Sequence, residues 1–301
     1  MWWFVFALLT ALLWGAADLF YKKGTVAEDK YSPMKIVVAV GFVMGLHALV
    51  YGLINRVSFT INDVVTYLPV SAMYIISMAI GYKGLRYLDL SVASPVQNAS
   101  GALVVILLLL VFQAKVTVYD VIAIVLVFAG IIGMGVIEKR EDDYVPLIES
   151  DKKYAVSVLA IVFPILYCVI DALGTFGDAV VLEQLKIISE DAALISYELT
   201  FFVCAVVCFI ILLCKKQKFD FKSDKFKLTA AIFETGGQFF YVFALAGNSV
   251  IAVPIVGSYC IFSVIFSRIF LKEKLSPRKL VMVILVIVGI VLMGVSEGLQ
   301  G

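Results

Sequence analysis

The chain alternates long apolar blocks with short polar intervals. A bilayer core of about 30 Å requires about 20 residues of helix, and the blocks have this length. Inside lipid a lone strand would leave its backbone polar groups unpaired, so the blocks are predicted to be helices. Ten of them are found, at about 2–22, 34–54, 66–85, 91–112, 118–137, 154–174, 192–214, 227–246, 249–270 and 278–296.

The longest polar interval divides these predicted helices into two sets of five. The expected organisation is a first five-helix repeat over 1–137, a polar linker over 138–153 and a second five-helix repeat over 154–301. The first block has no basic segment before it and is longer than the apolar part of a usual signal peptide, so we expect it to remain as a helix. The predicted fold class is an all-α integral membrane protein with ten transmembrane helices.

Composition supports a membrane protein and excludes several other classes. The 301 residues are 62% hydrophobic and 16% charged, whereas soluble domains are about a quarter charged. The mean hydropathy is +1.04. Because 24 Lys and Arg nearly balance 23 Asp and Glu, no basic surface for nucleic acid is expected. The five cysteines lie within apolar blocks, which argues against a disulfide scaffold.

Basic residues are distributed unequally between alternate ends of the predicted helices. With ten helices, 20 Lys and Arg fall on one side of the membrane and 3 on the other. The positive-inside rule places the richer side in the cytoplasm, so both termini are predicted to lie outside. We expect the protein to reside in a bacterial cytoplasmic membrane.

The two halves share short patterns in the same order. Trp14 precedes Asp18 by four residues in the first block, as Tyr167 precedes Asp171 in the sixth, and prolines occur near the start of the fourth and ninth blocks. Apolar helices can resemble one another through composition alone, but the shared order favours an internal repeat. Because five is odd, the second repeat would cross the membrane in the opposite sense, and such inverted repeats enclose a site near the midplane that opens alternately to each face.

Several motifs make the chain resemble the EamA-type transporters of the drug/metabolite transporter superfamily. They are Leu12-Leu13-Trp14-Gly15, Gly84-Leu85-Arg86-Tyr87-Leu88 before Ser91-Val92-Ala93, Phe270-Leu271-Lys272-Glu273-Lys274-Leu275-Ser276, and the Gly-rich end Gly289–Gly294. The first half departs from the pattern because Gln113-Ala114-Lys115 lacks the acidic residue found in Lys272-Glu273-Lys274. The resemblance implies ten helices in two inverted halves that move a small organic solute.

Five ionisable side chains fall well inside the apolar blocks: Asp18, His47, Asp171, Glu198 and Glu234. A charge within the membrane is costly, so such residues usually face a cavity and have a function. Four of the five are acids, which favours a positively charged solute. Asp18 and Asp171 could instead be solvated near the membrane surface. Glu198 could be a structural partner of another helix, and His47 could form a hydrogen bond between helices.

Helical spacing places aromatic and amide side chains on the same faces as these acids. Carboxylates beside aromatic rings can hold an organic cation through charge pairing and cation–π attraction, although single Trp and Tyr residues more often serve packing. The predicted substrate-binding residues are Trp14, Asp18, Tyr74, Asn98, Tyr167, Asp171, Glu198, Glu234, Gln238 and Tyr241. The candidates for proton coupling are Glu234, Glu198, Asp18 and His47.

The sequence contains no motif for driving or catalysing a reaction. It has no phosphate-binding loop for ATP and no protease or hydrolase motif, and His47 has no Cys or His cluster around it. We therefore expect neither an enzyme nor a bound cofactor or metal.

The leading interpretation is a secondary active transporter that works by alternating access and is coupled to protons. Its preferred substrate is a cationic or zwitterionic amine, such as a choline-like compound or an amino acid. A neutral metabolite, a broad drug range, a channel, and a non-transporting scaffold or assembly partner remain alternatives. The sequence leaves open the direction of transport, the coupling ion, and whether the protein is a monomer or a dimer.

Overall fold

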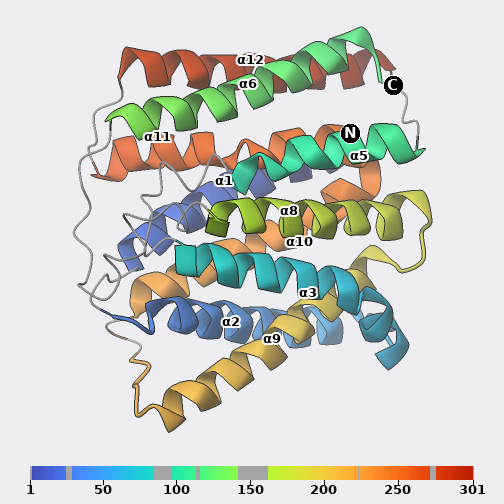
Figure 1. The fold of residues 1–301 in the computed structure, drawn as a ribbon. Helices are drawn as coiled ribbons and strands as arrows, with labels where there is room; N and C mark the ends of the chain where they lie inside the picture. Colours follow the sequence, from blue (N-terminus) through green and yellow to red (C-terminus); the bar gives the residue numbers. More distant parts are fainter. Residues whose placement is uncertain are drawn as a thin grey trace.

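The described part of the chain is a bundle of helices that lie side by side (Figure 1). A computed structural model describes residues 2–24, 29–84, 97–112, 116–141, 162–220, 222, 224–271 and 276–300, and these ranges contain no strand. The helices are α1 (Trp2–Gly24), α2 (Ser32–Asn55), α3 (Ile61–Gly84), α5 (Ser100–Phe112), α6 (Val118–Glu141), α8 (Val162–Ala179), the π-helix η2 (Val180–Gln184), α9 (Glu190–Cys214), α10 (Lys225–Gly257), α11 (Tyr259–Leu271) and α12 (Pro277–Gln300).

Six stretches of the described helices are long and apolar enough to cross a membrane. They are Trp2–Gly24, Ser32–Asn55, Ile61–Gly84, Ile165–Gln184, Glu190–Cys214 and Lys225–Ser263. Three shorter apolar helices accompany them, at Ser100–Phe112, Val118–Gly133 and Leu280–Leu292. The all-helical class is therefore confirmed. The count of ten stays a prediction, because the described residues omit 85–96 and 142–161, where the fourth and sixth predicted helices begin.

Several helix ends differ from the predicted ones; α3, for example, begins at Ile61 and not at 66. The sixth block was expected to end at 174, but the helical path continues through Asp178 and the π-helix to Gln184. The two acids Asp178 and Glu183 made this stretch resemble a polar loop. The fifth block was expected to end at 137, but α6 continues to Glu141.

Several other predicted features lie outside the described residues. These are the remainder of the linker, the segment from Leu85 to Pro95, the segments Gln113–Lys115 and Lys272–Leu275, and the start of the sixth block.

Helix α10 changes direction at Asn248, whose backbone is not helical (φ −164°, ψ 92°). This residue falls between the eighth and ninth predicted blocks. Glu183 accepts hydrogen bonds from the backbone N–H and the hydroxyl of Ser249, and Asn248 Oδ1 accepts from the N–H of Ile251 at 3.2 Å. Side chains therefore satisfy donors freed at the start of the following turn, as at an ordinary helix N-terminus.

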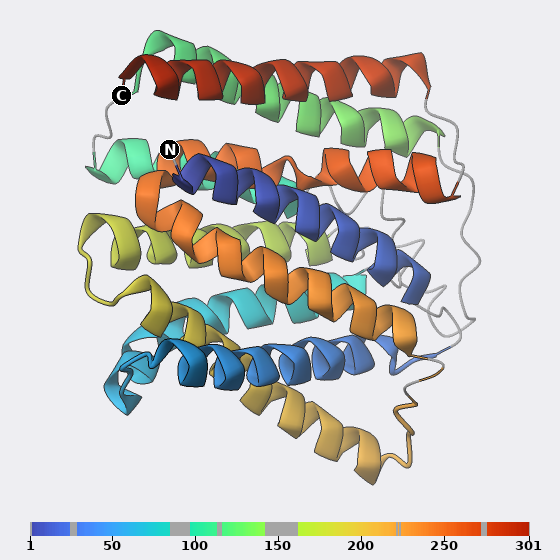
Figure 2. The same ribbon diagram turned by 180° about the vertical axis from the view of Figure 1, so that it is seen from behind.

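The helices pack in pairs that bring distant parts of the sequence together. Helix α1 packs on α10 and α3 on α8, while α2 packs on α9 and α6 on α12. The α6–α12 pair forms one edge of the bundle and the α2–α9 pair the opposite edge, and both termini lie at the same end (Figures 1 and 2). The helices between the two edges, together with Tyr197 of α9, surround the site described next.

A close approach of α1 to α11 positions part of this site. A Cβ atom added to Gly15 would lie 2.6 Å from the Cβ of Phe262 and 3.1 Å from the carbonyl oxygen of Tyr259. Only glycine therefore fits without a shift of one helix, which is a common use of small residues between membrane helices. The contact places Asp18, one turn along α1, beside Ser263 of α11.

Candidate functional site

A cavity of about 130 Å³ lies among the central helices. A single water needs about 10–15 Å³ on a comparable measure, so the space is larger than a packing defect and can hold a small organic molecule. Its described lining comprises Trp14, Asp18, Tyr21, Tyr74, Met78, Gly81, Tyr82, Gln97, Asn98, Ser100, Gly101, Tyr167, Asp171, Thr175, Tyr197, Glu234, Gln238, Tyr241, Val253, Val256, Gly257 and Tyr259.

The structure brings most of the predicted binding residues to this one cavity. They come from both halves of the sequence and from α1, α3, α8, α10 and the turn before α5. The predicted residues in the lining are Trp14, Asp18, Tyr74, Asn98, Tyr167, Asp171, Glu234, Gln238 and Tyr241. Of the ten predicted, only Glu198 is not part of the described lining. Their position is therefore established, while their binding role stays a prediction.

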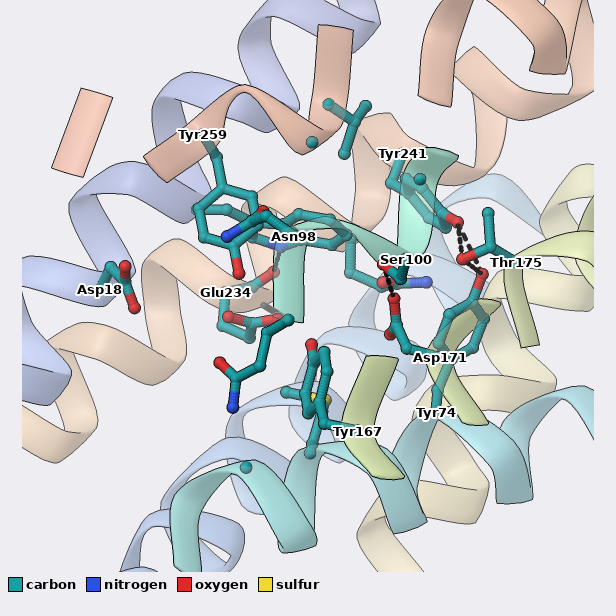
Figure 3. A pocket seen from close by; sticks show the side chains of 18 of the residues that line it. Asp18, Tyr74, Asn98, Ser100, Tyr167, Asp171, Thr175, Glu234, Tyr241 and Tyr259 are labelled. Atoms are coloured by element: carbon teal, nitrogen blue, oxygen red, sulfur yellow. Dashed lines mark hydrogen bonds between the residues drawn. The ribbon is translucent and has the colours of Figure 1, made fainter. Parts of the chain in front are cut away.

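Three carboxyl groups face the cavity (Figure 3). Asp18 accepts a hydrogen bond from Ser263 Oγ at 2.9 Å, and Asp171 accepts one from Ser100 Oγ at 2.8 Å. Glu234 is 9% exposed and accepts a long bond of 3.5 Å from the Tyr21 hydroxyl.

The described cavity lining has no basic side chain beside these carboxyl groups. The described residues of the cavity lining include no Lys, Arg or His. Lys22 lies one helical turn beyond Asp18 on α1 and is not one of the lining residues. The described lining therefore offers negative charge to a bound solute without offering a matching positive group.

Aromatic rings form much of the remaining wall. The ring of Trp14 lies 5.1 Å from that of Tyr241 and 5.9 Å from that of Tyr259, measured between centroids. Tyr74 lies 5.9 Å from Tyr197 in an edge-to-face arrangement. A ring face attracts a cation within about 6 Å, so this wall complements the carboxyl groups.

Neutral polar groups complete the lining. Gln97, Asn98 and Gln238 are each less than one-tenth exposed. The amide nitrogen of Gln238 has no hydrogen-bond partner among the described residues. A buried donor without a partner is unfavourable, and an acceptor on a bound solute could satisfy it.

A hydrogen-bonded cluster lies at the end of the cavity where α3 begins. The Tyr241 hydroxyl lies 2.6 Å from the Tyr74 hydroxyl and can donate to it, and Thr175 Oγ1 lies within hydrogen-bond distance of both, at 3.1 Å from Tyr74 and 3.3 Å from Tyr241. With its one hydrogen Tyr74 can then donate to Asp178 Oδ2 at 3.3 Å, and Tyr67 donates to the other carboxylate oxygen of Asp178.

Sequence reasoning did not identify Thr175, Asp178, Tyr82 or Tyr259. Asp171, Thr175 and Asp178 are spaced at i, i+4 and i+7, so they share one helix face. This spacing could have revealed Thr175 and Asp178 if the sixth block had been extended. Tyr82 follows Tyr74 by eight residues, near the same face of α3, whereas Tyr259 carries no comparable signal.

Glu198 and His47 form a separate pair outside the described cavity lining. His47 Nδ1 lies 2.8 Å from Glu198 Oε1, and the Glu198 side chain is fully buried between α2 and α9. The His47 ring stacks on Tyr51, which donates to Asp191 Oδ1 at 2.6 Å. Glu198 is thus bonded to a neighbouring helix, in line with the structural alternative, and does not line the cavity as we had expected.

Three comparisons place this architecture among known proteins. A protein of known crystal structure superposes with a TM-score of 0.71 over 99% of this chain and 98% of that chain, and the two are 13% identical, so the likeness concerns the fold. An uncharacterized protein of Methanocaldococcus jannaschii is 30% identical over 143 residues, which are 46% of this chain and 98% of that protein.

The third comparison concerns the family. Residues 1–136 and 184–295 match the EamA-like transporter family, in agreement with the motifs noted in the sequence. These two ranges include most of the chain and the described helices that surround the cavity except α8, which lies between them. The protein therefore belongs to the EamA-like transporter family, a group of membrane transporters within the drug/metabolite transporter superfamily.

Proposed function

We propose that the protein is a secondary active transporter for a small organic cation or zwitterionic amine. The observation that carries this proposal is the meeting of Asp18, Asp171 and Glu234 in one aromatic-walled cavity whose described lining includes no basic residue. Acids facing a cavity within the membrane commonly mark a solute pathway. The same rings and carboxyl groups would bind an anion poorly.

The helix pairing supports two related halves. If α1, α2, α3, α5 and α6 correspond to α8, α9, α10, α11 and α12, each main contact has a counterpart. The α1–α10 contact corresponds to α3–α8, α1–α11 to α5–α8, and α2–α10 to α3–α9, while α2–α9 and α6–α12 correspond to themselves. An approximate two-fold relation of this kind is what inverted repeats produce, and it supports alternating access around a fixed site.

The relative from Methanocaldococcus jannaschii also supports a repeat of half-chain length, because nearly all of it aligns with 46% of this chain. We propose a first repeat over residues 1–137 and a second over 154–301, with the linker between them shortened by the extension of α6 to Glu141. We further propose that the Lys- and Arg-rich ends, including the ends of α1 and α3, face the cytoplasm of a bacterial cell.

Proton coupling follows from competition for the same carboxyl groups. A protonated carboxyl is neutral and no longer attracts a cation, so cation and proton binding would exclude each other. Asp18 and Glu234 lie in the cavity where such competition is possible. Glu198 and His47 form a second ionisable pair outside the described lining, so they are weaker candidates.

Ligand binding and flux together test the proposal. Purified protein is heated with choline, tetramethylammonium, lysine, benzoate or sorbitol, because a ligand of the native state raises the unfolding temperature. Stabilisation by one or more cations and not by benzoate or sorbitol is expected. Liposomes containing the protein should then show saturable uptake of the stabilising cation, accelerated by a proton gradient. Stabilisation by benzoate alone, or no flux of any stabilising cation, would contradict the proposal.

A further inference from the structure

Asp178 lies beyond the wall of the cavity, at the end where α3 begins. The described lining contributed by α3 and α8 stops at Tyr74 and Thr175 in this direction. Tyr67 lies about two turns closer to the start of α3, and Asp178 lies one turn further along α8. Both are completely buried. This end of the cavity is therefore closed by side chains that do not themselves face it.

The closure depends on one carboxylate. Asp178 accepts hydrogen bonds from two tyrosines of α3, Tyr67 and Tyr74, and so ties α3 to α8. Tyr74 extends the connection to Tyr241 of α10 through their bond of 2.6 Å. Asp178 is the group of the cluster that accepts from both of these tyrosines, so the connection between α3 and α8 depends most on it.

The opposite end of the cavity is held differently. There Tyr82 donates to Tyr21 at 3.2 Å, and Tyr21 donates to Glu234 at 3.5 Å. All three residues face the cavity, whereas Tyr67 and Asp178 lie behind it. A tyrosine–carboxylate cluster thus lies at each end of the cavity. The cluster centred on Asp178 closes its end, whereas the cluster centred on Glu234 is part of the cavity wall.

We propose that Asp178 is a gating residue that holds Tyr67 and Tyr74 against α8 and closes the cavity on the side where α3 begins. Opening on that side requires Asp178 to release both tyrosines. This role rests on the proposed alternating access, but it concerns a residue that does not contact the solute. Replacing one of the two acceptor oxygens of Asp178 should therefore favour the state open on that side.

The experiment measures which side of the membrane reaches the cavity. In a background with the five native cysteines replaced, Val256→Cys places a thiol on the cavity wall and Ser58→Cys marks the side where α3 begins. A membrane-impermeant maleimide is applied to vesicles of each orientation. We expect Val256→Cys to be protected from the Ser58 side, and Asp178→Asn to speed its labelling from that side by roughly tenfold.

Two further variants keep the result interpretable. Tyr67→Phe removes one hydrogen-bond donor to Asp178 and should speed the labelling by a smaller factor. It tests the same gate if Asp178→Asn fails to fold. Ser71→Ala removes a buried hydroxyl that has no hydrogen-bond partner among the described residues and lies between Tyr67 and Tyr74 on α3, so it should leave the labelling unchanged.

The possible outcomes separate the gate from the proposed function. Unchanged labelling in folded Asp178→Asn and Tyr67→Phe proteins, or equal changes in Ser71→Ala, would overturn the gating role. Because the assay contains no solute, it judges the gate even if no tested amine is transported. Conversely, if the protein transports a cation but neither Asp178→Asn nor Tyr67→Phe changes the labelling, the proposed function is supported and the gating role is rejected.

Discussion

Asp18 and Asp171 have matching surroundings on opposite sides of the cavity. Each accepts a hydrogen bond from a serine of another helix, Ser263 for Asp18 at 2.9 Å and Ser100 for Asp171 at 2.8 Å. Each also follows an aromatic lining residue, Trp14 or Tyr167, by four positions. A solute between them would meet a carboxyl group from each half of the protein.

Because their environments match, replacing Asp18 or Asp171 should lower the affinity for the cation to a similar extent. Asp18→Asn and Asp171→Asn should each weaken the binding of the stabilising cation by roughly tenfold, because each removes one charge and keeps the side-chain shape. Calorimetric titration of the purified variants measures this. Asp63→Asn, at the start of α3 and outside the described lining, is the matched control and should keep the native affinity. An effect of only one aspartate would show that the two halves contribute unequally.

The aromatic wall predicts a preference among amines. Trp14→Leu removes the ring nearest Tyr241 and should weaken tetramethylammonium binding by roughly threefold to thirtyfold. Benzoate and sorbitol should remain without effect. Trp2→Leu is the control, since Trp2 is 78% exposed near the chain terminus. If both variants bind the cation equally well, the rings do not contribute to its recognition.

Much of the site could be predicted because burying a carboxyl group in lipid is costly, which singled out Asp18, Asp171 and Glu234. The same reasoning selected Glu198, which pairs with His47 instead. Glu234 faces the cavity and Glu198 faces His47 of α2, and the sequence of a single helix does not show what each of its side chains faces. Tyr259 was missed for a related reason. With 14 tyrosines in the chain, only helix packing shows which ones reach the cavity.

The fold was predictable where a block was uniformly apolar and not where polar groups interrupted it. Asp178 and Glu183 lower the hydropathy at the end of the sixth block, so this helical stretch was predicted as a loop. In the structure, other side chains satisfy both groups, Tyr67 and Tyr74 for Asp178 and Ser249 for Glu183. Such partners come from distant segments, so local hydropathy could not anticipate them.

The close contact of α1 with α11 predicts that replacing Gly15 by alanine destabilises the protein more than replacing Gly236. Gly15→Ala should lower the free energy of unfolding by about 1–3 kcal/mol, because the added methyl group meets backbone and Cβ atoms that cannot move independently. Gly236→Ala should be tolerated, since its Cβ would lie 3.5 Å from Leu13 in ordinary contact. Thermal unfolding in detergent compares them. Equal unfolding temperatures would show that α1 and α11 can separate freely.

The position of Glu198 predicts that stability and binding can be separated. Glu198→Gln should lower the free energy of unfolding by about 1–3 kcal/mol, because it weakens the bond to His47. Cation affinity should stay within about twofold of the native value, since Glu198 is absent from the described lining. His47→Gln should behave in the same way. A large loss of affinity with normal stability would instead place Glu198 in the binding site.

Glu234 should control the exchange of protons for cation. It is one of three carboxyl groups in the cavity and the most enclosed of them, and its described side-chain bond, from Tyr21, is long at 3.5 Å. If cation and proton compete there, adding choline, or whichever cation stabilises the protein, should release protons into a weakly buffered solution. A pH-sensitive dye measures that release, and the apparent affinity for the cation should rise with pH.

The Glu234→Gln side chain cannot exchange a proton, so this variant should release fewer protons and its cation affinity should depend less on pH. Glu198→Gln is the control because it removes another buried acid, which lies outside the described lining. If Glu234→Gln releases as many protons as the native protein, coupling resides in another group, and Asp18 becomes the next residue to replace.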